Sequence, residues 1–328
     1  MKKVLAIVFS DLHINDWSKF NQDNKRTQDH FRVLSLIKEA CLKYECPALF
    51  CGDLFHKPEN ISNSLLSQVF GAFDKLNDNS KFEIYGISGN HDMVKVAKPG
   101  ELPLSWFNTF ASKYNFLNSL DVHNKNIHTY NGGGSFTVWG VPHIDHNIGL
   151  NDYLKSLKFT DGFKNILLLH TDYPGAKDTD GSEVGTSENL NLNILNRFDL
   201  VLCGHIHKPQ RLSKKVYMIG APIQQRRTDK DCDMGYWKLY EDLSMVFVPL
   251  SNKFPRFIDV SSPEEVKEDG NYYTVISSKV MAMDTVTNPI SKKLSKKRMV
   301  KRYLKAKNIT DKKKESILLD IIKESEDD

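Results

Sequence analysis

The feature that most constrains this chain is a series of five short polar motifs, each following an apolar run. The runs have the length and composition of buried strands, and they are Val4–Phe9, Ala48–Cys51, Phe82–Ile87, Ile166–Leu169 and Leu200–Cys203. The motifs that follow them are Asp11-Leu12-His13, Gly52-Asp53, Gly89-Asn90-His91-Asp92, His170 and Gly204-His205-Ile206-His207. Open α/β sheets bind ligands beyond the carboxyl ends of their strands. We therefore expect the five motifs to meet in one site.

The residue types in these motifs indicate a metal-assisted reaction on a phosphodiester. A phosphodiester resists attack because its oxygens repel a nucleophile, and two divalent ions about 3.5–4 Å apart overcome this repulsion. Ions so close together need a shared carboxylate, for which Asp53 is the natural candidate. Mixed Asp, His and Asn ligands favour manganese or iron over calcium. We predict two Mn²⁺ ions, with Mg²⁺, Fe²⁺ or Zn²⁺ as alternatives.

Between the strand runs, apolar residues recur at helical spacing. Helices are predicted over Arg26–Tyr44, Ile61–Leu76 and Pro103–Tyr114, and Ser62 or Asn60 can cap the second of them. Later strands are predicted over Ser135–Val141, Val216–Gly220, Gly235–Tyr240 and Met245–Leu250, and we expect antiparallel pairing in this second half. The predicted fold class is α/β (α+β), with two packed sheets flanked by helices.

The pattern changes after Pro255, which predicts additional modules. Phe257–Val260 and Tyr272–Ser277 are predicted strands of a small appended α/β domain. Residues 292–314 then hold twelve lysines or arginines and a single acid, Asp311, a charge of +11 against +4 for the whole chain. The basic stretch is predicted to form one helix, and a second predicted helix after it carries an apolar stripe of Ile317, Leu318, Ile321 and Ile322. We predict domains over residues 1–254, 255–290 and 291–328, the last a basic helix pair.

Cysteine content and hydropathy indicate the compartment. The five cysteines are odd in number and form no Cys-x-x-Cys pair, which suits a reducing compartment. The apolar run Val4–Phe9 is too short for a signal peptide and lacks a cleavage site of small residues. No run approaches the roughly 20 apolar residues that span a bilayer. We expect a cytoplasmic protein with no membrane association.

The motif series resembles the calcineurin-like metallophosphoesterase family across roughly the first 210 residues. The resemblance implies a first metal held by Asp11, His13, Asp53 and His207, and a second held by Asp53, Asn90, His170 and His205. It implies that His91 binds no metal and instead donates a proton to the leaving oxygen or stabilises it. Asp92 would orient His91 from behind.

A narrower resemblance concerns Gly52-Asp53-Leu54-Phe55-His56, which is similar to the SbcD-type DNA-repair nucleases. It implies that His56 lies near the scissile phosphate; the alternative is an ordinary loop histidine. Ile219-Gly220-Ala221-Pro222 and Gly235-Tyr236-Trp237 are similar to phage recombination endonuclease subunits. The resemblance further implies a DNA-facing cap after Pro255, a homodimer formed through helices 61–76 and 103–114, and the cytoplasm of a bacterial or phage-infected cell.

For the C-terminal helix pair, the resemblance implies docking on the coiled coil of an SbcC-type ATPase. The stripe Ile317–Ile322 favours docking, because phosphate binding alone needs no apolar surface. Basic residues such as Lys296, Lys297 and Arg298 are candidates for binding DNA phosphates. The alternative for this basic stretch is a solvated helix face.

The predicted function is a two-metal, manganese-dependent DNA exonuclease and endonuclease, the nuclease subunit of an SbcCD-type complex that processes double-strand breaks. One alternative is a metallophosphodiesterase of the same fold acting on a cyclic nucleotide or dinucleotide. That alternative explains the five motifs but leaves the modules after Pro255 unexplained. A second alternative is a non-catalytic scaffold, although no expected ligand is missing from the sequence.

Overall fold

The computed structural model describes residues 2–16, 21, 24–57, 61–77, 83–93, 110–111, 113–114, 116–117, 129–131, 136–143, 150–159, 162–184 and 190–276. The chain divides into two compact units, Met1–Val275 and Ile276–Asp328. The predicted C-terminal helix pair, its stripe Ile317–Ile322 and the basic residues Lys296–Arg298 lie outside the described residues, as does most of the predicted helix Pro103–Tyr114.

Two six-stranded mixed sheets form the centre of the first unit. The first sheet has the order β12-β11-β1-β2-β3-β4, with β1 Val4–Phe9, β2 Ala48–Phe50, β3 Ile84–Ile87, β4 Phe116–Leu117, β11 Gly235–Tyr240 and β12 Met245–Pro249. The second has the order β5-β6-β7-β8-β10-β9, with β5 Thr129–Asn131, β6 Phe136–Val141, β7 Lys164–His170, β8 Leu200–Gly204, β9 Gln210–Arg211 and β10 Val216–Met218. Strands β1 to β4 are parallel, as are β6, β7, β8 and β10.

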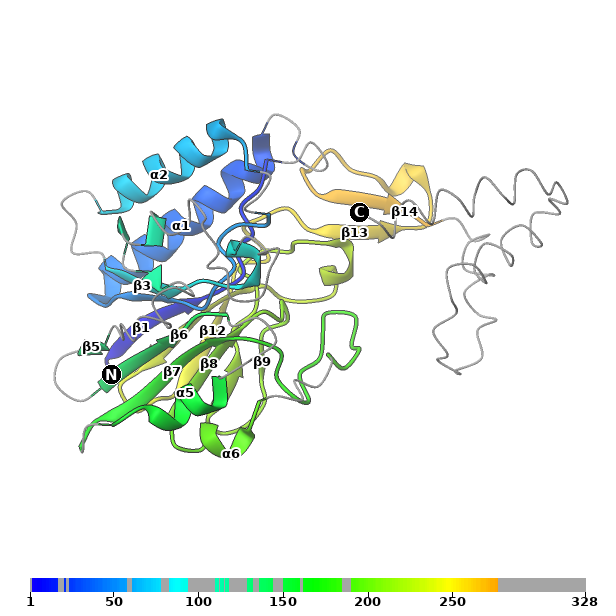
Figure 1. Cartoon of the computed structure of the whole chain (residues 1–328). Helices are drawn as coiled ribbons and strands as arrows, with labels where there is room; N and C mark the ends of the chain where they lie inside the picture. The colour runs from blue at the N-terminus through cyan, green and yellow to red at the C-terminus, as the bar shows by residue number, and fades with distance from the viewer. Residues whose placement is uncertain are drawn as a thin grey trace, which may run out of the picture. The chain divides into compact units, whose positions relative to one another are not determined.

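Alternation along the strands assigns each side chain to one of three apolar layers. In β1, Ile7 and Phe9 face helices α1 (Lys25–Tyr44) and α2 (Asn63–Asn77), whereas Val8 faces the second sheet. In β7, Leu168 faces the first sheet and Leu169 faces the side of α5 (Leu150–Ser156) and α6 (Leu192–Leu195). Figure 1 shows the two helix pairs on opposite outer faces. The predicted two-sheet sandwich flanked by helices is confirmed.

Sequence patterning explains where the long helices begin and end. The hydroxyl of Ser62 accepts a hydrogen bond from the backbone N–H of Leu65 at 3.1 Å, which confirms the predicted cap of α2. Helix α1 ends at Glu45, whose left-handed conformation (φ 50°) lets its N–H bond to the carbonyls of Cys41 and Leu42. The main apolar residues of α2 (Leu65, Val69, Phe73 and Leu76) are buried in the core. Dimerisation through this helix stays a prediction.

One predicted strand pairs differently from expectation. Val216–Met218 (β10) was expected in an antiparallel second half, but it pairs parallel to β8 and extends the parallel series. The antiparallel part is confined to β5, β9, β11 and β12 at the sheet margins. The reason is the long loop between β8 and β10. It returns the chain to the end of the sheet where β8 begins, so β10 runs parallel to β8, and β9 forms the edge strand.

A small sheet follows the sandwich within the same compact unit. Its strands, β13 (Phe257–Val260) and β14 (Tyr272–Val275), are parallel, and the rings of Phe257 and Tyr272 lie 5.1 Å apart. The two predicted strands are confirmed. Short 3-10 turns are η3 (Asn90–Asp92), η5 (Arg227–Asp229) and η6 (Pro263–Glu265).

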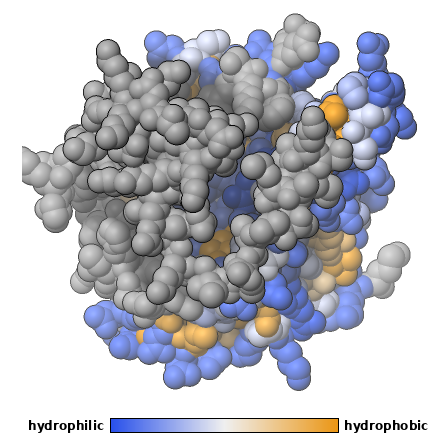
Figure 2. Space-filling model, turned by 90° about the vertical axis from the view of Figure 1, so that its right-hand side faces the viewer, coloured by the Kyte–Doolittle hydropathy of each residue, from blue (hydrophilic) through white to orange (hydrophobic). Residues whose placement is uncertain are grey.

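Most apolar residues that the structure describes are buried in the three core layers. All five cysteines are buried and free. On the face drawn in Figure 2, hydrophilic residues predominate among those described, and hydrophobic ones show only in small separate groups. Among the described residues, no helix combines the length and apolarity needed to cross a membrane.

Candidate metal centre

The five motifs occupy loops at the carboxyl ends of β1, β2, β3, β7 and β8. The loops after β1 and β2 run side by side, since the N–H of Asp11 bonds to the carbonyl of Gly52 at 2.9 Å and that of His13 to the carbonyl of Asp53 at 3.0 Å. Parallel pairing therefore continues past the strands and carries their polar residues to one edge of the sandwich.

Four candidate ligands sit on backbone that few non-glycine residues adopt. The φ angles are 51° at Asp11, 49° at His13, 59° at Asp53 and 91° at His205. Positive φ brings the Cβ atom close to the backbone and is uncommon outside glycine. Strained conformations of this kind persist where the surrounding structure fixes them, and they cluster at functional sites.

The glycines that precede the ligands are required by close approach. A Cβ atom on Gly89 would collide with the carboxylate of Asp53, and one on Gly52 would collide with the ring of His170. Gly52 also has a φ of 99°, which side chains rarely tolerate. The Gly-Asp and Gly-Asn-His-Asp motifs thus contain glycine because ligands from other strands fill the space beside it.

The first cluster consists of Asp11, His13 and His207, whose ligand atoms all lie within 4.8 Å of one another. The Nε2 atoms of His13 and His207 are 3.0 Å apart. Asp11 and His13 are almost fully buried. These three residues belong to the set that the family resemblance implies for the first metal.

The second cluster consists of Asp53, His170 and His205, again with ligand atoms within 4.8 Å of one another. The amide oxygen of Asn90 joins it, 3.1 Å from Nε2 of His170 and 2.9 Å from Nδ1 of His205. Oδ2 of Asp53 lies 3.3 Å from Nε2 of His170 and 3.6 Å from Nε2 of His13. One oxygen of Asp53 therefore faces both clusters, which is the position that a bridging ligand needs.

The hydrogen bonds of His170 show that these residues fit a cation. Its Nδ1 lies 2.7 Å from the carbonyl oxygen of Cys51, so Nδ1 carries the proton and donates it. In the neutral ring the lone pair of Nε2 then points at the oxygens of Asp53 and Asn90. Three electron-rich atoms therefore converge, and only a cation or a proton can supply positive charge among them.

The pKa values of His170 and Asp53 also indicate that this site requires positive charge. Burial disfavours a charged His170, but the carboxylate of Asp53 outweighs burial and raises the pKa of His170 to about 9. Burial likewise disfavours the charged form of Asp53, but His170 and His13 hold its pKa well below the usual range. A divalent ion would satisfy these donors and replace the proton. The chemistry of the donor set suits manganese, iron or zinc.

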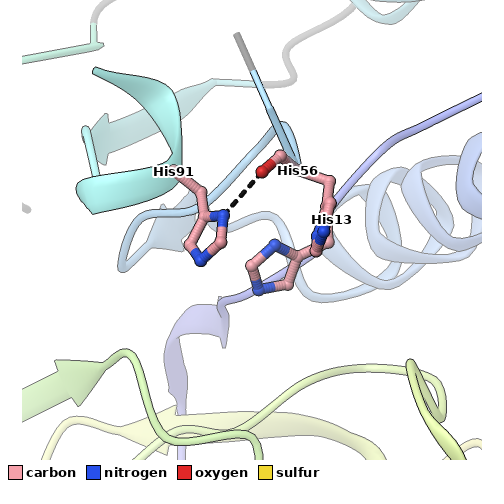
Figure 3. A group of neighbouring side chains, drawn as sticks. All are labelled: His13, His56 and His91. Atoms are coloured by element: carbon pink, nitrogen blue, oxygen red, sulfur yellow. Dashed lines mark hydrogen bonds between the residues drawn. The ribbon is translucent and has the colours of Figure 1, made fainter. Parts of the chain in front are cut away.

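Three histidine rings converge beside the first cluster, as Figure 3 shows for His13, His56 and His91. Their ring centroids are 4.8 to 5.2 Å apart. Nδ1 of His91 lies 2.5 Å from the carbonyl oxygen of His56, and the N–H of His91 donates to Oδ1 of Asp53 at 2.8 Å. His91 is thus fixed to both the His56 loop and the carboxylate shared by the two clusters.

The carboxylate of Asp92 is bonded to the backbone, and its predicted action on His91 stays a prediction. Its carboxylate accepts hydrogen bonds from the backbone N–H groups of Leu54 (3.2 Å), Phe55 (2.9 Å) and Gly89 (2.9 Å). Among the described contacts, the ring of His91 is oriented by the His56 carbonyl and not by Asp92. Asp92 is fully buried, and burial raises its pKa to about 7. It ties the β2 and β3 loops together and so positions His91 through the backbone.

Two carboxylates beside the clusters escaped sequence reasoning. Asp172 lies 3.1 Å from Nε2 of His205, and the fully buried Asp229 lies 3.8 Å from Nδ1 of His207. A carboxylate against the outer nitrogen of a metal-binding histidine fixes its orientation and raises its basicity. Asp172 had a weak signal in its position two residues after His170, whereas Asp229 had none. His143, outside every motif, bonds through Nδ1 to the His170 carbonyl at 3.1 Å.

Comparison with known proteins identifies the family. The sequence model described as calcineurin-like phosphoesterase matches residues 5–209, more than half of the chain. The chain belongs to the calcineurin-like phosphoesterase family. Among solved structures, it is similar to one described as a dimetal phosphatase from Danio rerio, with 12% identity, 76% of this chain and 100% of that chain covered, and a TM-score of 0.45. A second solved structure matches at 12% identity, with the same coverage and a TM-score of 0.44.

Membership of this family and the two clusters make the protein a metal-dependent phosphoesterase with a dimetal site. The residues of the two clusters would hold metal ions, which would supply charge to neutralise the phosphate and to activate a water molecule. Asp53 supplies the shared carboxylate between the clusters. The ring of His91 is held by the His56 carbonyl, and proton donation from it to a leaving oxygen stays a prediction.

Removing the shared charge should abolish activity without unfolding the chain. We expect Asp53→Asn to reduce Mn²⁺-dependent hydrolysis of bis-p-nitrophenyl phosphate by several orders of magnitude, because neither cluster then keeps its common anion. Circular dichroism should stay near native. Retention of more than about a tenth of the wild-type rate would contradict the bridging role given to Asp53.

Substitution of His91 should separate metal binding from turnover. We expect His91→Asn to bind two Mn²⁺ by calorimetry while its rate falls about 10²–10⁴-fold, the contribution of one general acid. A leaving group that needs no proton should reduce this loss. If the variant binds one metal fewer than the wild type, His91 is a ligand and the assignment is wrong.

Proposed function

We propose that the protein is a DNA nuclease of the SbcD type, acting at two metals on phosphodiester bonds at or near double-strand ends. The observation that carries the proposal is the placement of His56. This residue comes from the Gly-Asp-Leu-Phe-His segment, and its ring lies 5.1 Å from that of His91 and 5.2 Å from that of His13. His56 belongs to neither of the two clusters that share Asp53, and its ring lies beside the first of them, where it could contact a bound phosphate.

The state of the His56 ring suits contact with a polyanion. Burial, with the neighbouring His91, lowers the pKa of His56 to about 4, so the ring is neutral at physiological pH. A neutral imidazole can donate one hydrogen bond to a phosphate oxygen without adding repulsion to the adjacent metal cluster. His56 would hold the strand while His91 protonates the leaving oxygen.

The substrate test compares DNA with a small ester. We expect Mn²⁺-dependent degradation of blunt duplex DNA as well as hydrolysis of bis-p-nitrophenyl phosphate. His56→Asn should slow digestion of duplex ends about 10–100-fold, the value of a hydrogen bond to a charged group, and should affect single-strand nicking and the small ester less.

The small ester serves as the internal control, because its hydrolysis requires the metal ions but no contact with an extended strand. Ester cleavage with no DNA degradation, with or without an ATPase partner, would reject the nuclease and favour a small-substrate phosphodiesterase. Equal loss on all three substrates would reject the strand-holding role of His56.

We further propose that residues 255–290 face the DNA and that residues 291–328 dock on a coiled-coil ATPase. The sequence supports the second point through the charge of +11 over residues 292–314 and the apolar stripe Ile317–Ile322. Two short helices are marginal alone and gain stability by packing on a partner. Basic residues Lys296, Lys297 and Arg298 would add salt-sensitive contacts to DNA.

Deletion of residues 291–328 should prevent co-purification with the ATPase while leaving hydrolysis of the small ester intact. Ile317→Asp combined with Ile321→Asp should reproduce the deletion, because burying two unpaired charges costs several kcal/mol. The matched control neutralises Lys296, Lys297 and Arg298, which should weaken DNA binding at low salt only. Partner binding by the truncated protein would refute the docking role.

A further inference from the structure

The segment Gln224–Cys232 (the connector) contacts loops of the first metal cluster on one side and the small sheet β13–β14 on the other. It follows β10 and contains the turn η5 (Arg227–Asp229). None of the five motifs includes it. Its contacts nevertheless reach the residues on either side of the first cluster.

On the metal side, the connector presents Asp229, which has no exposed surface. The carboxylate lies 3.8 Å from Nδ1 of His207 and accepts hydrogen bonds from the backbone of Gln225 (2.7 Å) and Arg226 (3.1 Å) and from the hydroxyl of Thr179 (2.8 Å). These donors near Asp229 are thus already hydrogen-bonded to its carboxylate, whereas His207 is not. The carboxylate cannot shift without the turn that carries it.

A second connector residue reaches the other ligand loop of the first cluster. The side-chain amide of Gln225 donates to the carbonyls of Leu12 (3.1 Å) and Asp11 (3.4 Å), between the ligands Asp11 and His13. Its amide oxygen accepts from the buried guanidinium of Arg26 at 3.1 Å. The connector is therefore hydrogen-bonded to the Asp11–His13 loop and places a carboxylate 3.8 Å from the His207 ring.

On the opposite side, the connector is bonded to the small sheet. The amide oxygen of Gln224 accepts from the N–H of Phe257 at 2.8 Å, and the amide nitrogen of the same side chain donates to the carbonyl of Asp229 at 2.9 Å. Asp259 in β13 forms ion pairs with Arg227 (2.8 Å) and with Lys230. One side chain, Gln224, thus spans from the strand to the residue behind His207.

We propose that Asp229 and Gln225 are positioning residues for the first metal, and that the connector couples the position of the small sheet to the affinity of that metal. Displacement of β13 moves Gln224 and the η5 turn, and with them the carboxylate that orients His207. The second cluster is outside this path, because its outer carboxylate is Asp172. The proposal depends on metal binding by the first cluster and is independent of which phosphoester is cleaved.

This coupling makes the small sheet a point of control for the site. The chain continues from β14 directly into residues 276–328. A protein that binds those residues and pulls on the small sheet would weaken or strengthen one metal site without touching the other. A coupling of this kind is reciprocal, so filling the first metal site should also stabilise the small sheet.

The test measures Mn²⁺ binding to the full-length protein by calorimetry, with the spin-coupled metal pair followed by electron paramagnetic resonance. We expect Asp229→Asn to weaken one of two sites about 10–100-fold, as loss of a carboxylate behind a metal-bound histidine does. Asp172→Asn is the matched control, and it should weaken the other site instead. Equal loss at both sites in Asp229→Asn would overturn the positioning role.

Coupling to the small sheet is tested at Asp259, which pairs with Arg227 and Lys230 of the connector. Asp259→Asn should weaken the first site roughly five-fold or more, whereas Asp242→Asn, which removes a surface ion pair with Lys2, should change neither site. Combined with Asp229→Asn, the Asp259 substitution should add nothing further, because both act on one path. Unchanged affinity in Asp259→Asn, or additive losses in the double variant, would overturn the coupling.

Discussion

The structure depends on one electrostatic constraint, the burial of the Asp53 carboxylate among imidazoles from both sheets. Its Oδ2 lies 3.3 Å from His170 and 3.6 Å from His13. A buried anion is stable only when positive charge or hydrogen-bond donors surround it. The glycines leave room for this carboxylate, and the loop residues with positive φ direct their side chains toward it. Asp92 contributes by accepting backbone hydrogen bonds that hold the loops in place. The two sheets pack through an apolar layer that includes Val8 and Leu168, and this packing brings the ligands together at one edge.

Much of this arrangement was predictable because its signals are local in the sequence. An apolar run followed by Asp, Asn or His marks a strand end, and parallel neighbours bring such ends together. That reasoning placed Asp11, Asp53 and Asn90 after β1, β2 and β3, and His170 and His205 at the ends of β7 and β8. The continuous apolar run of β1 and the period-3.6 burial in α1 were equally legible. The Ser62 cap of α2 followed from the chemistry of a single residue.

Other features depend on contacts that no local pattern encodes. Asp229 lies behind His207 through a turn that has neither hydrophobic period nor motif. The sequence neighbourhood suggested that Asp92 serves His91, but the fold gives its oxygens to the β2 loop and leaves His91 to the His56 carbonyl. The parallel pairing of β10 with β8 is likewise a property of the returning loop and not of the strand residues. Each is a long-range relation that appears only once the sheets are assembled.

The central claim is that two metal ions share Asp53, one in each cluster. Crystals of the Mn²⁺-loaded protein, measured at the manganese absorption edge, test it directly through the anomalous difference map. The account predicts two peaks about 3.5–4 Å apart, with Asp53 between them, the first among Asp11, His13 and His207 and the second among Asn90, His170 and His205. A single peak, or two peaks of which only one contacts Asp53, would contradict it.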